Sequence, residues 1–164
     1  MGKLLGIDIG CGDRKVSVEN YKMISVDIRG EVHPDIVAPL DKIPVPSESY
    51  DLAFASHVLE HVKRAEVHNA LKEWRRILKI GGKLQIIVPD LEVAAIELLS
   101  CKTSQETFNI LWGEQNHEFN IHQSGYTHMI LEAMIKNYGF EINKMEVRDR
   151  QIFLTSTKLE GEYL

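Results

Sequence analysis

The sequence predicts a single-domain α/β protein, spanning residues 1–164, built on a mostly parallel, doubly wound sheet. Short apolar segments alternate with helical segments through the middle of the chain, which is the pattern of parallel strands joined by crossover helices. Two apolar segments, 140–147 and 151–157, follow each other near the C-terminus with only a charged turn between them. We therefore expect a closing hairpin that adds one antiparallel strand near the edge of the sheet.

The predicted strands before this hairpin are short apolar runs that end near glycine, proline or aspartate. They cover residues 3–8, 22–27, 35–38, 51–55 and 83–88, with a proline-rich loop between the third and fourth. Ligands of such sheets bind beyond the carboxyl ends of the strands. The loops after the first, second, fourth and fifth strands are therefore the candidate binding region.

The helical segments show helical spacing of apolar residues or an N-terminal capping residue. The first covers 66–79, and Gly81 and Gly82 are expected to end it with a left-handed cap. Asp90 can cap a helix over 91–99. Thr103 with Glu106 fits a capping box for a helix that runs to residue 112. Thr127 can cap a last helix, which Gly139 ends. Right-handed crossovers are expected to place helices on both faces of the sheet.

The composition of the chain argues against some classes of function. The net charge is -5 and no basic stripe is present, so nucleic acid is not an expected partner. The chain has no apolar span long enough for a membrane helix. Its two cysteines, Cys11 and Cys101, lie far apart and outside any CxxC motif, which is typical of reduced thiols in a cytoplasmic protein. The sequence gives no indication of the oligomeric state.

The stretch LLGIDIGCGDRK, residues 4–15, indicates a strand that enters a glycine loop at Gly10 and Gly12. Lys15 occupies the third glycine position of a dinucleotide fingerprint, and no phosphate P-loop follows. A lone G-x-G equally fits a tight turn. The span from Gly12 to Asp27 is too short for a full helix, so residues 13–21 are expected to form a loop or a single turn. Without a helix N-terminus, pyrophosphate binding and NAD are disfavoured.

Asp27 ends the second predicted strand, where a carboxylate can accept both hydroxyls of a ribose. Together with the glycine loop, it favours a nucleoside-containing cofactor.

The segments GIDIGCG, VDI, YDLAFASHVLEHV and LKEWRRILKIGGKLQIIVPD, in this order and spacing, resemble class I S-adenosylmethionine-dependent methyltransferases, which have a Rossmann-like fold. A narrower resemblance, carried by GCGDRK, VDIR, WGEQNHEFNIHQSGYT and NYGF, is to small methyltransferase type 11-like proteins that are often linked with glycan biosynthesis. The resemblance implies methyl transfer from S-adenosylmethionine to a small-molecule or glycan acceptor. The alternative is a non-catalytic module that binds S-adenosylmethionine or its demethylated product, S-adenosylhomocysteine.

The resemblance also implies cofactor contacts. The backbone amides of Gly10, Cys11 and Gly12 would approach the methionine end, and Asp8 would orient this loop or the cofactor's ammonium group. Cys11 is expected to be a small loop residue rather than a nucleophile.

The adenosine end would lie against the loops after the second and third strands. Asp27 would bind the ribose, Ile28 would lie beside the adenine, and Leu40 would cover the other face of the base. Many relatives carry an aspartate near Leu40 for the adenine amino group, whereas here Pro39 and Asp41 flank it. Ser56 and His57 would lie near the sulfonium.

Histidines are the candidate bases, because their unperturbed pKa of about 6.5 suits proton transfer near neutrality. His57 and His122 are the candidates, with His117 a weaker one; the alternative for His122 is that it only holds its loop through the backbone. His57 and His61 are four residues apart and would share a helix face. No third ligand is evident beside them, although His117 and His122 are available, so we expect no metal and a short helix beneath the cofactor instead.

Overall fold

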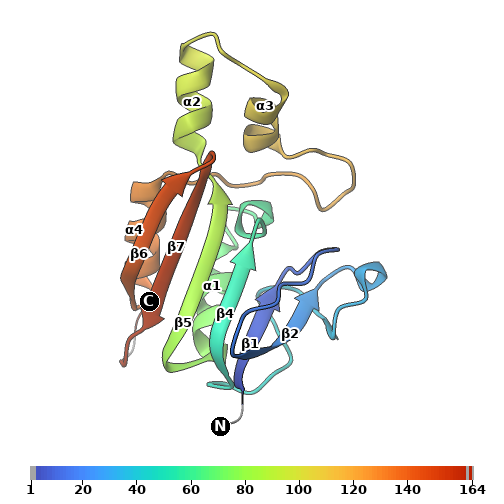
Figure 1. Cartoon of the computed structure of the whole chain (residues 1–164), viewed down its shortest axis with the longest axis vertical. Coiled ribbons are helices and arrows are strands. Elements are labelled where there is room, and N and C mark those ends of the chain that lie inside the picture. Colours follow the sequence, from blue (N-terminus) through green and yellow to red (C-terminus); the bar gives the residue numbers. More distant parts are fainter. Residues whose placement is uncertain (1–2, 162, 164) are drawn as a thin grey trace.

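A computed structural model describes residues 3–161 and residue 163. Within this part of the chain, seven strands form one sheet in the order β3-β2-β1-β4-β5-β7-β6 (Figure 1). The strands are β1 Leu4–Ile9, β2 Tyr21–Asp27, β3 Ile36–Val37, β4 Tyr50–Ser56, β5 Leu78–Pro89, β6 Phe140–Arg148 and β7 Gln151–Lys158. Pairing is parallel from β3 to β5, and β7 is antiparallel to both β5 and β6. The predicted mostly parallel α/β sheet, including the antiparallel strand near the edge, is confirmed.

The helices also follow the prediction closely. The α-helices are α1 Val67–Ile77, α2 Leu91–Leu99, α3 Gln105–Trp112 and α4 His128–Asn137, and the short 3-10 helices are η1 Gly30–Val32 and η2 Leu59–His61. Asp90 caps α2 by accepting the amide of Glu92, and Thr127 caps α4 by accepting the amide of Ile130. Both caps are as predicted.

Two helix boundaries differ from the prediction. Helix α1 ends at Ile77, and Leu78 is already extended, so Gly81 and Gly82 lie inside β5 and do not cap the helix. The reason is a non-local one: Leu78 pairs with Tyr50 of β4 and starts β5 early. Helix α3 is capped by Ser104 rather than Thr103, because Ser104 and Thr107 exchange the two bonds of a capping box.

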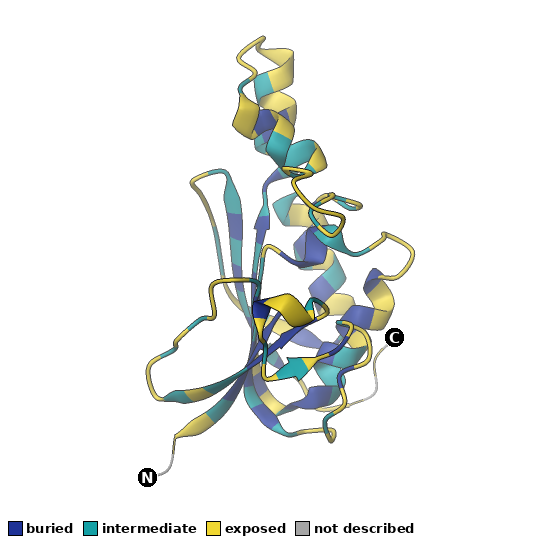
Figure 2. Ribbon diagram, turned by 90° about the vertical axis from the view of Figure 1, so that its right-hand side faces the viewer, coloured by how far each residue is buried: buried dark blue, intermediate teal, exposed yellow. Residues whose placement is uncertain are grey.

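Helices cover one face of the sheet rather than both. In Figure 1, α1 and α4 lie behind the strands, and α2 and α3 project beyond the end of β5. Figure 2, seen from the side, also shows helices packed on one face of the sheet. Burial alternates residue by residue along β7 between buried and half-buried side chains, as expected for a strand with one covered face.

The expected second layer is missing because the connection from β1 to β2 is too short to hold a helix. Residues 10–20, all described, contain only turns and irregular chain. The prediction that residues 13–21 form no long helix is confirmed.

Helix α1 carries the core and also positions one wall of the site. Its predicted apolar stripe is buried, and Trp74 is fully buried. The indole N–H of Trp74 donates to the carbonyl of Leu40 at 3.1 Å, which fixes the loop after β3. Glu73 accepts the amide of Ile43 at 2.7 Å and pairs with Arg76, so the proline-rich loop is held against α1.

None of the helices in the described ranges combines the length and the apolar character that crossing a bilayer requires.

Candidate functional site

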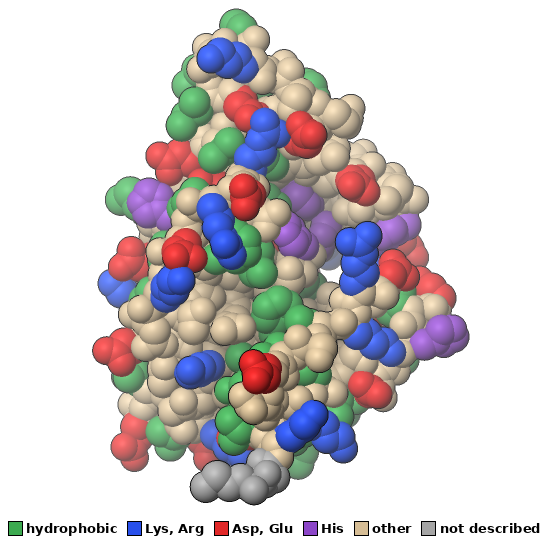
Figure 3. Space-filling model, in the orientation of Figure 1, with side chains coloured by type: hydrophobic (Ala, Val, Ile, Leu, Met, Phe, Trp, Pro, Cys, Tyr) green, Lys and Arg blue, Asp and Glu red, His purple; other side chains and the backbone are tan. Residues whose placement is uncertain are grey.

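A cavity of about 1220 Å³ lies beyond the carboxyl ends of the parallel strands. Gly10 follows β1, and Asp27, Ser56 and Pro89 end β2, β4 and β5; all four line the cavity. Every residue predicted to contact the cofactor, and all three candidate histidines His57, His117 and His122, line this one cavity. Figure 3 shows histidine side chains gathered in a hollow of the surface. The strand-end loops singled out from the sequence thus meet at one candidate site.

The glycine loop is held in a conformation that side chains would disturb. Gly10 has φ +67° and Gly12 has φ +54°, in the left-handed region that favours glycine. A Cβ at Gly10 would lie 2.2 Å from Cγ2 of Val58. The amides of Gly10 and Cys11 both donate to the carbonyl of Val26, at 2.8 and 3.0 Å. These amides are thus used within the chain, in contrast to the expectation that they face a ligand.

Asp27 is buried and links two loops. Its Oδ2 accepts the amide of Gly12 at 2.8 Å, and its Oδ1 accepts the amide of Arg29 at 2.9 Å. The Nε of Arg29 lies 3.5 Å from Oδ1. A carboxylate has about four lone-pair sites, so acceptor capacity remains for hydroxyl groups in the cavity.

Asp8 holds the outer part of the same loop. It is buried, and its Oδ2 accepts the amide of Val16 at 2.8 Å. Burial raises the pKa of Asp8, partly opposed by the bond from Val16. Burial, with the nearby charges of Asp27 and Asp8, raises the pKa of the Cys11 thiol to about 11. A thiol of this kind is protonated at neutral pH, which agrees with the prediction that Cys11 is not a nucleophile.

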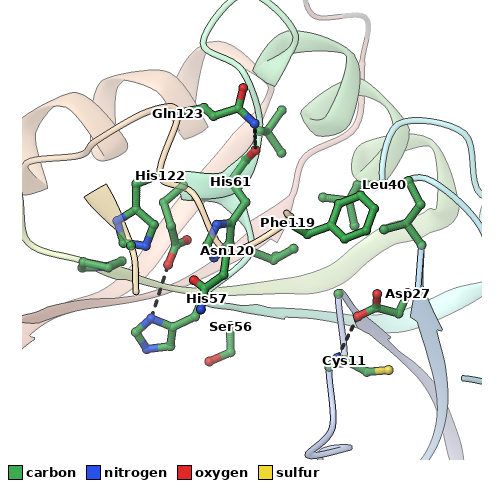
Figure 4. A pocket seen from close by; sticks show the side chains of 18 of the residues that line it. Cys11, Asp27, Leu40, Ser56, His57, His61, Phe119, Asn120, His122 and Gln123 are labelled. Atoms are coloured by element: carbon green, nitrogen blue, oxygen red, sulfur yellow. Dashed lines mark hydrogen bonds and ion pairs between the residues drawn. The ribbon is translucent and has the colours of Figure 1, made fainter. Parts of the chain in front are cut away.

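The glycine-loop end of the cavity also has an apolar part. Ile28 is exposed and Leu40 is half-buried, and both line the cavity. Figure 4 shows Phe119, from the segment after α3, lying on the side of Leu40. Sequence reasoning did not identify Phe119, because nothing local to residues 116–127 indicates that this segment reaches the end of β2.

His57 occupies a strained position at the end of β4. Its φ of +52° is uncommon for a residue with a side chain and often marks a functional site. Its Nδ1 lies 3.3 Å from Oε1 of Glu60, and its side chain is 43% exposed toward the cavity. Pairing with Glu60 raises the pKa of His57, against the opposing effect of burial.

Glu60 is a second residue of this site that the sequence did not reveal. It is 2% exposed. In the described part of the chain, neither carboxylate oxygen has a hydrogen-bond partner of good geometry. Buried carboxylates normally have such partners.

The segment before α4 closes over η2. The amides of Gln123 and Ser124 donate to the carbonyl of Glu60 at 2.8 and 3.1 Å. The side-chain amide of Gln123 donates to the carbonyl of His61 at 3.0 Å (Figure 4). The loop between α3 and α4, residues 113–127 and called the late loop below, thus folds over the ligand edge of the sheet.

This closure brings His61 and His122 together, with ring centroids 4.9 Å apart. Nδ1 of His61 lies 3.1 Å from the carbonyl oxygen of Ile121, and Nδ1 of His122 lies 2.8 Å from that of Ile110. Burial lowers the pKa of His61. The hydrogen bond between His122 and the carbonyl of Ile110 is the contact expected if His122 only holds its loop in place.

The shared helix face of His57 and His61 is a wrong prediction. The short helix exists, but η2 covers only Leu59–His61, and the left-handed backbone of His57 lies outside it. His117 is exposed and lines the cavity, but it does not belong to the group of Glu60, His61 and His122.

Comparison with known proteins finds a matching family model. Residues 6–86 match the family model described as "Methyltransferase domain". No curated protein matches the sequence.

Solved structures with the same fold include an S-adenosylmethionine-dependent methyltransferase from Methanosarcina mazei, at 19% identity and a TM-score of 0.73, covering 97% of this chain and 94% of that one. A methyltransferase of Bacillus halodurans, described as putative, has 12% identity and a TM-score of 0.72, with 98% and 94% covered. A Burkholderia thailandensis 1,6-didemethyltoxoflavin N1-methyltransferase, solved with S-adenosylhomocysteine and its substrate, has 12% identity and a TM-score of 0.68, with 96% and 72% covered.

At these identities the structural likeness establishes the fold, and the family match over 6–86 includes both the glycine loop and Asp27. The match over residues 6–86 identifies a methyltransferase domain in this chain, and the chain shares its fold with S-adenosylmethionine-dependent methyltransferases.

Proposed function

We propose that the enzyme methylates a hydroxyl or amine of a small-molecule or glycan acceptor, with the cofactor and the acceptor at opposite ends of one cavity. The observation that carries this proposal is the continuity of the cavity from the glycine loop to the histidines of η2 and the late loop. Its volume of about 1220 Å³ exceeds the roughly 300–1,000 Å³ of a typical single-ligand pocket. The resemblance to glycan-linked small methyltransferases supports a glycan acceptor.

The glycine-loop end fits S-adenosylmethionine, which supplies an activated methyl group when bound. Asp27 keeps free lone pairs for the ribose hydroxyls, and Ile28 and Leu40 offer apolar contact to the adenine. Because its amides are used internally, the loop of Gly10, Cys11 and Gly12 would admit the methionine end by lacking side chains at both glycines. Asp8 would hold this loop in place through Val16.

The other end of the cavity would receive the acceptor. Ser56 and His57 end β4 between the two halves, near the position proposed for the sulfonium. Since Nδ1 of His57 faces Glu60, its Nε2 would take a proton from the acceptor, and a side-chain hydrogen bond with Gln151 also helps to raise the pKa of the ring. A base placed in this way contributes about 10²–10⁴-fold to the rate, and alignment of the two reactants contributes about 7–11 kcal/mol.

His122 is the second candidate base. Its Nδ1 is bonded to the backbone of Ile110, so only Nε2 is free for a proton transfer. His57 is the stronger candidate, because its partner is a carboxylate that stabilises the protonated ring.

Two measurements test the proposal. Titration calorimetry with S-adenosylmethionine, S-adenosylhomocysteine and NAD should show binding of the first two compounds only. Transfer of a labelled methyl group should then be screened in fractions of cell extract, including glycan fractions. Binding without transfer to any fraction would favour the non-catalytic module, and binding of NAD alone would overturn the cofactor assignment.

A further inference from the structure

The geometry points to a metal site formed by Glu60, His61 and His122 at the acceptor end of the cavity, suited to a divalent first-row transition ion such as Zn²⁺. One ligand atom from each of these residues lies within 4.8 Å of the others. Among residues 3–161 and 163, no other group of three His, Cys, Asp or Glu side chains comes this close together. The expectation of no metal was based on the lack of an evident third ligand beside the HVLEHV segment, with His117 and His122 available only from a distant part of the sequence. The fold supplies that ligand from the late loop.

The carboxylate of Glu60 is the first independent reason. It is 2% exposed, and both of its oxygens lack a hydrogen-bond partner in the described residues. A buried carboxylate whose oxygens lack hydrogen bonds is costly, even with one ion-pair neighbour. His57 is near, at 3.3 Å from Oε1, yet it leaves Oε2 unmatched. A cation between Glu60 and the two imidazoles would satisfy the carboxylate.

The histidine tautomers are the second reason. The carbonyl oxygens of Ile121 and Ile110 can only accept, so the Nδ1 atoms of His61 and His122, at 3.1 and 2.8 Å from them, carry the hydrogens. The Nε2 atom of each neutral ring then holds the lone pair. Metal-binding histidines almost always donate their second ring N–H to a carbonyl or carboxylate in this way. Both rings thus hold a lone pair on Nε2 that is free to bind an ion.

The ligand set indicates the class of ion. Two imidazoles and one carboxylate bind Zn²⁺ in catalytic sites that leave a position open, and they also suit other first-row ions. All three residues line the cavity, so the open position would face the space proposed for the acceptor. A hydroxyl bound there would lose its proton more readily. With an ion bound, Nε2 of His122 would be a ligand, which leaves His57 as the candidate base.

The test uses the full chain, freed of metal by chelation and without cofactor. Calorimetric titration should show one Zn²⁺ per chain, and added Co²⁺ should produce visible absorption bands of a nitrogen- and oxygen-ligated ion. Glu60→Gln keeps the size of the side chain and removes its charge, and it should weaken Zn²⁺ binding by at least the 10–100-fold that is typical for loss of a supporting residue. His122→Ala should do the same and should abolish the Co²⁺ bands.

His117→Ala is the matched control, because His117 lines the same cavity and is exposed. It should bind Zn²⁺ as the parent protein does. The parent protein itself decides the question if the variants fold poorly, since absence of stoichiometric binding to it overturns the proposal. Equal affinities of the parent protein and Glu60→Gln, or an equal loss in His117→Ala, also overturn it. Cofactor affinity measured separately on the metal-free protein tests the glycine-loop site alone.

Discussion

The carboxylate of Asp27 accepts the amide hydrogen of Gly12 at 2.8 Å, so the end of β2 holds the loop that leaves β1. In a fold with a helix between these strands, the helix would position the glycine loop. Here residues 10–20 contain no helix, and one buried carboxylate joins the two strand ends directly. The same side chain therefore has a structural role and a proposed role in ribose binding.

Replacement of Asp27 by alanine should weaken S-adenosylmethionine binding. Hydrogen bonds to a charged group contribute about 1.5–3 kcal/mol, which corresponds to roughly a 10–150-fold rise in Kd. The variant should also be less stable, because the amide of Gly12 loses its acceptor. Calorimetry gives the affinity, and urea unfolding gives the loss of stability.

Asp35→Ala is the matched control for Asp27→Ala. The Asp35 carboxylate accepts the amide and hydroxyl of Ser25 at 2.8 and 2.7 Å, and Asp35 lies outside the residues that line the cavity. Its loss should reduce stability without changing Kd for the cofactor. If Asp27→Ala binds the cofactor as tightly as Asp35→Ala does, Asp27 has only the structural role.

Alanine at Gly10 should destabilise the protein by two separable effects. The left-handed backbone of Gly10 costs an L-residue about 1–2 kcal/mol. The added Cβ would also lie 2.2 Å from Val58, and overpacking of this kind costs a further 1–3 kcal/mol or so. Urea unfolding measures the sum.

Gly81→Ala isolates the backbone part of this cost. Gly81 has φ +76°, and a Cβ added there would meet nothing within 4 Å, so only the strain should appear. Val58→Ala in the Gly10→Ala background should recover the steric part and leave the strain. If Gly10→Ala lowers the free energy of unfolding by no more than Gly81→Ala does, the contact with Val58 does not add to the cost.

Alkylation of Cys11 should be slow at neutral pH and should rise with pH up to about 11. The pKa of Cys11 is raised from its ordinary 9.0 to about 11, and only the thiolate reacts. Since a raised pKa lowers the thiolate fraction at a given pH, about 100-fold less thiolate is expected at pH 8 than for an ordinary thiol. Rates of iodoacetamide labelling from pH 7 to 11 in a Cys101→Ser variant check this.

The parent protein provides the internal comparison for this experiment, because Cys101 is exposed and should label first. Asp27→Asn removes one of the negative charges that raise the Cys11 pKa, so its pH profile should shift downward. Labelling of Cys11 at neutral pH as fast as that of Cys101 would contradict the expectation.

Features that depend on nearby residues were predictable from the sequence. The apolar stripe of α1 follows from helical spacing, and the missing helix after β1 follows from the short span between Gly12 and Asp27. Features set by distant partners were not predictable. β5 begins at Leu78 because β4 pairs there, which ends α1 early.

The site shows the same division. The strand ends located Asp27 and His57, since ligand edges follow from the order of the strands. The environment of Glu60 could not be anticipated, because its neighbour His122 arrives from the late loop, held by contacts such as that of Gln123 with His61, 62 positions apart. The left-handed backbone of His57 also has no local signal in the sequence.

Once an acceptor is identified, replacement of His57 by glutamine should lower the turnover rate by about 10²–10⁴-fold, the contribution of a placed general base. Glutamine is similar in size and can form hydrogen bonds, but it cannot take up a proton. Because His57 accepts the proton of the acceptor in this proposal, Kd for S-adenosylmethionine should stay close to that of the parent protein. Single-turnover kinetics with saturating cofactor measure the step.

His122→Gln distinguishes the two candidate bases, and His68→Gln is the control. His68 is an exposed histidine of α1 whose Nδ1 contacts only the nearby carbonyl of Ala65, so its loss should leave turnover unchanged. A large loss in His57→Gln with a smaller one in His122→Gln assigns proton transfer to His57, whose partner is Glu60. If both variants turn over the acceptor at the parental rate, neither histidine is the base. The enzyme then works by alignment of the two reactants in the cavity, which supplies about 7–11 kcal/mol without any proton acceptor.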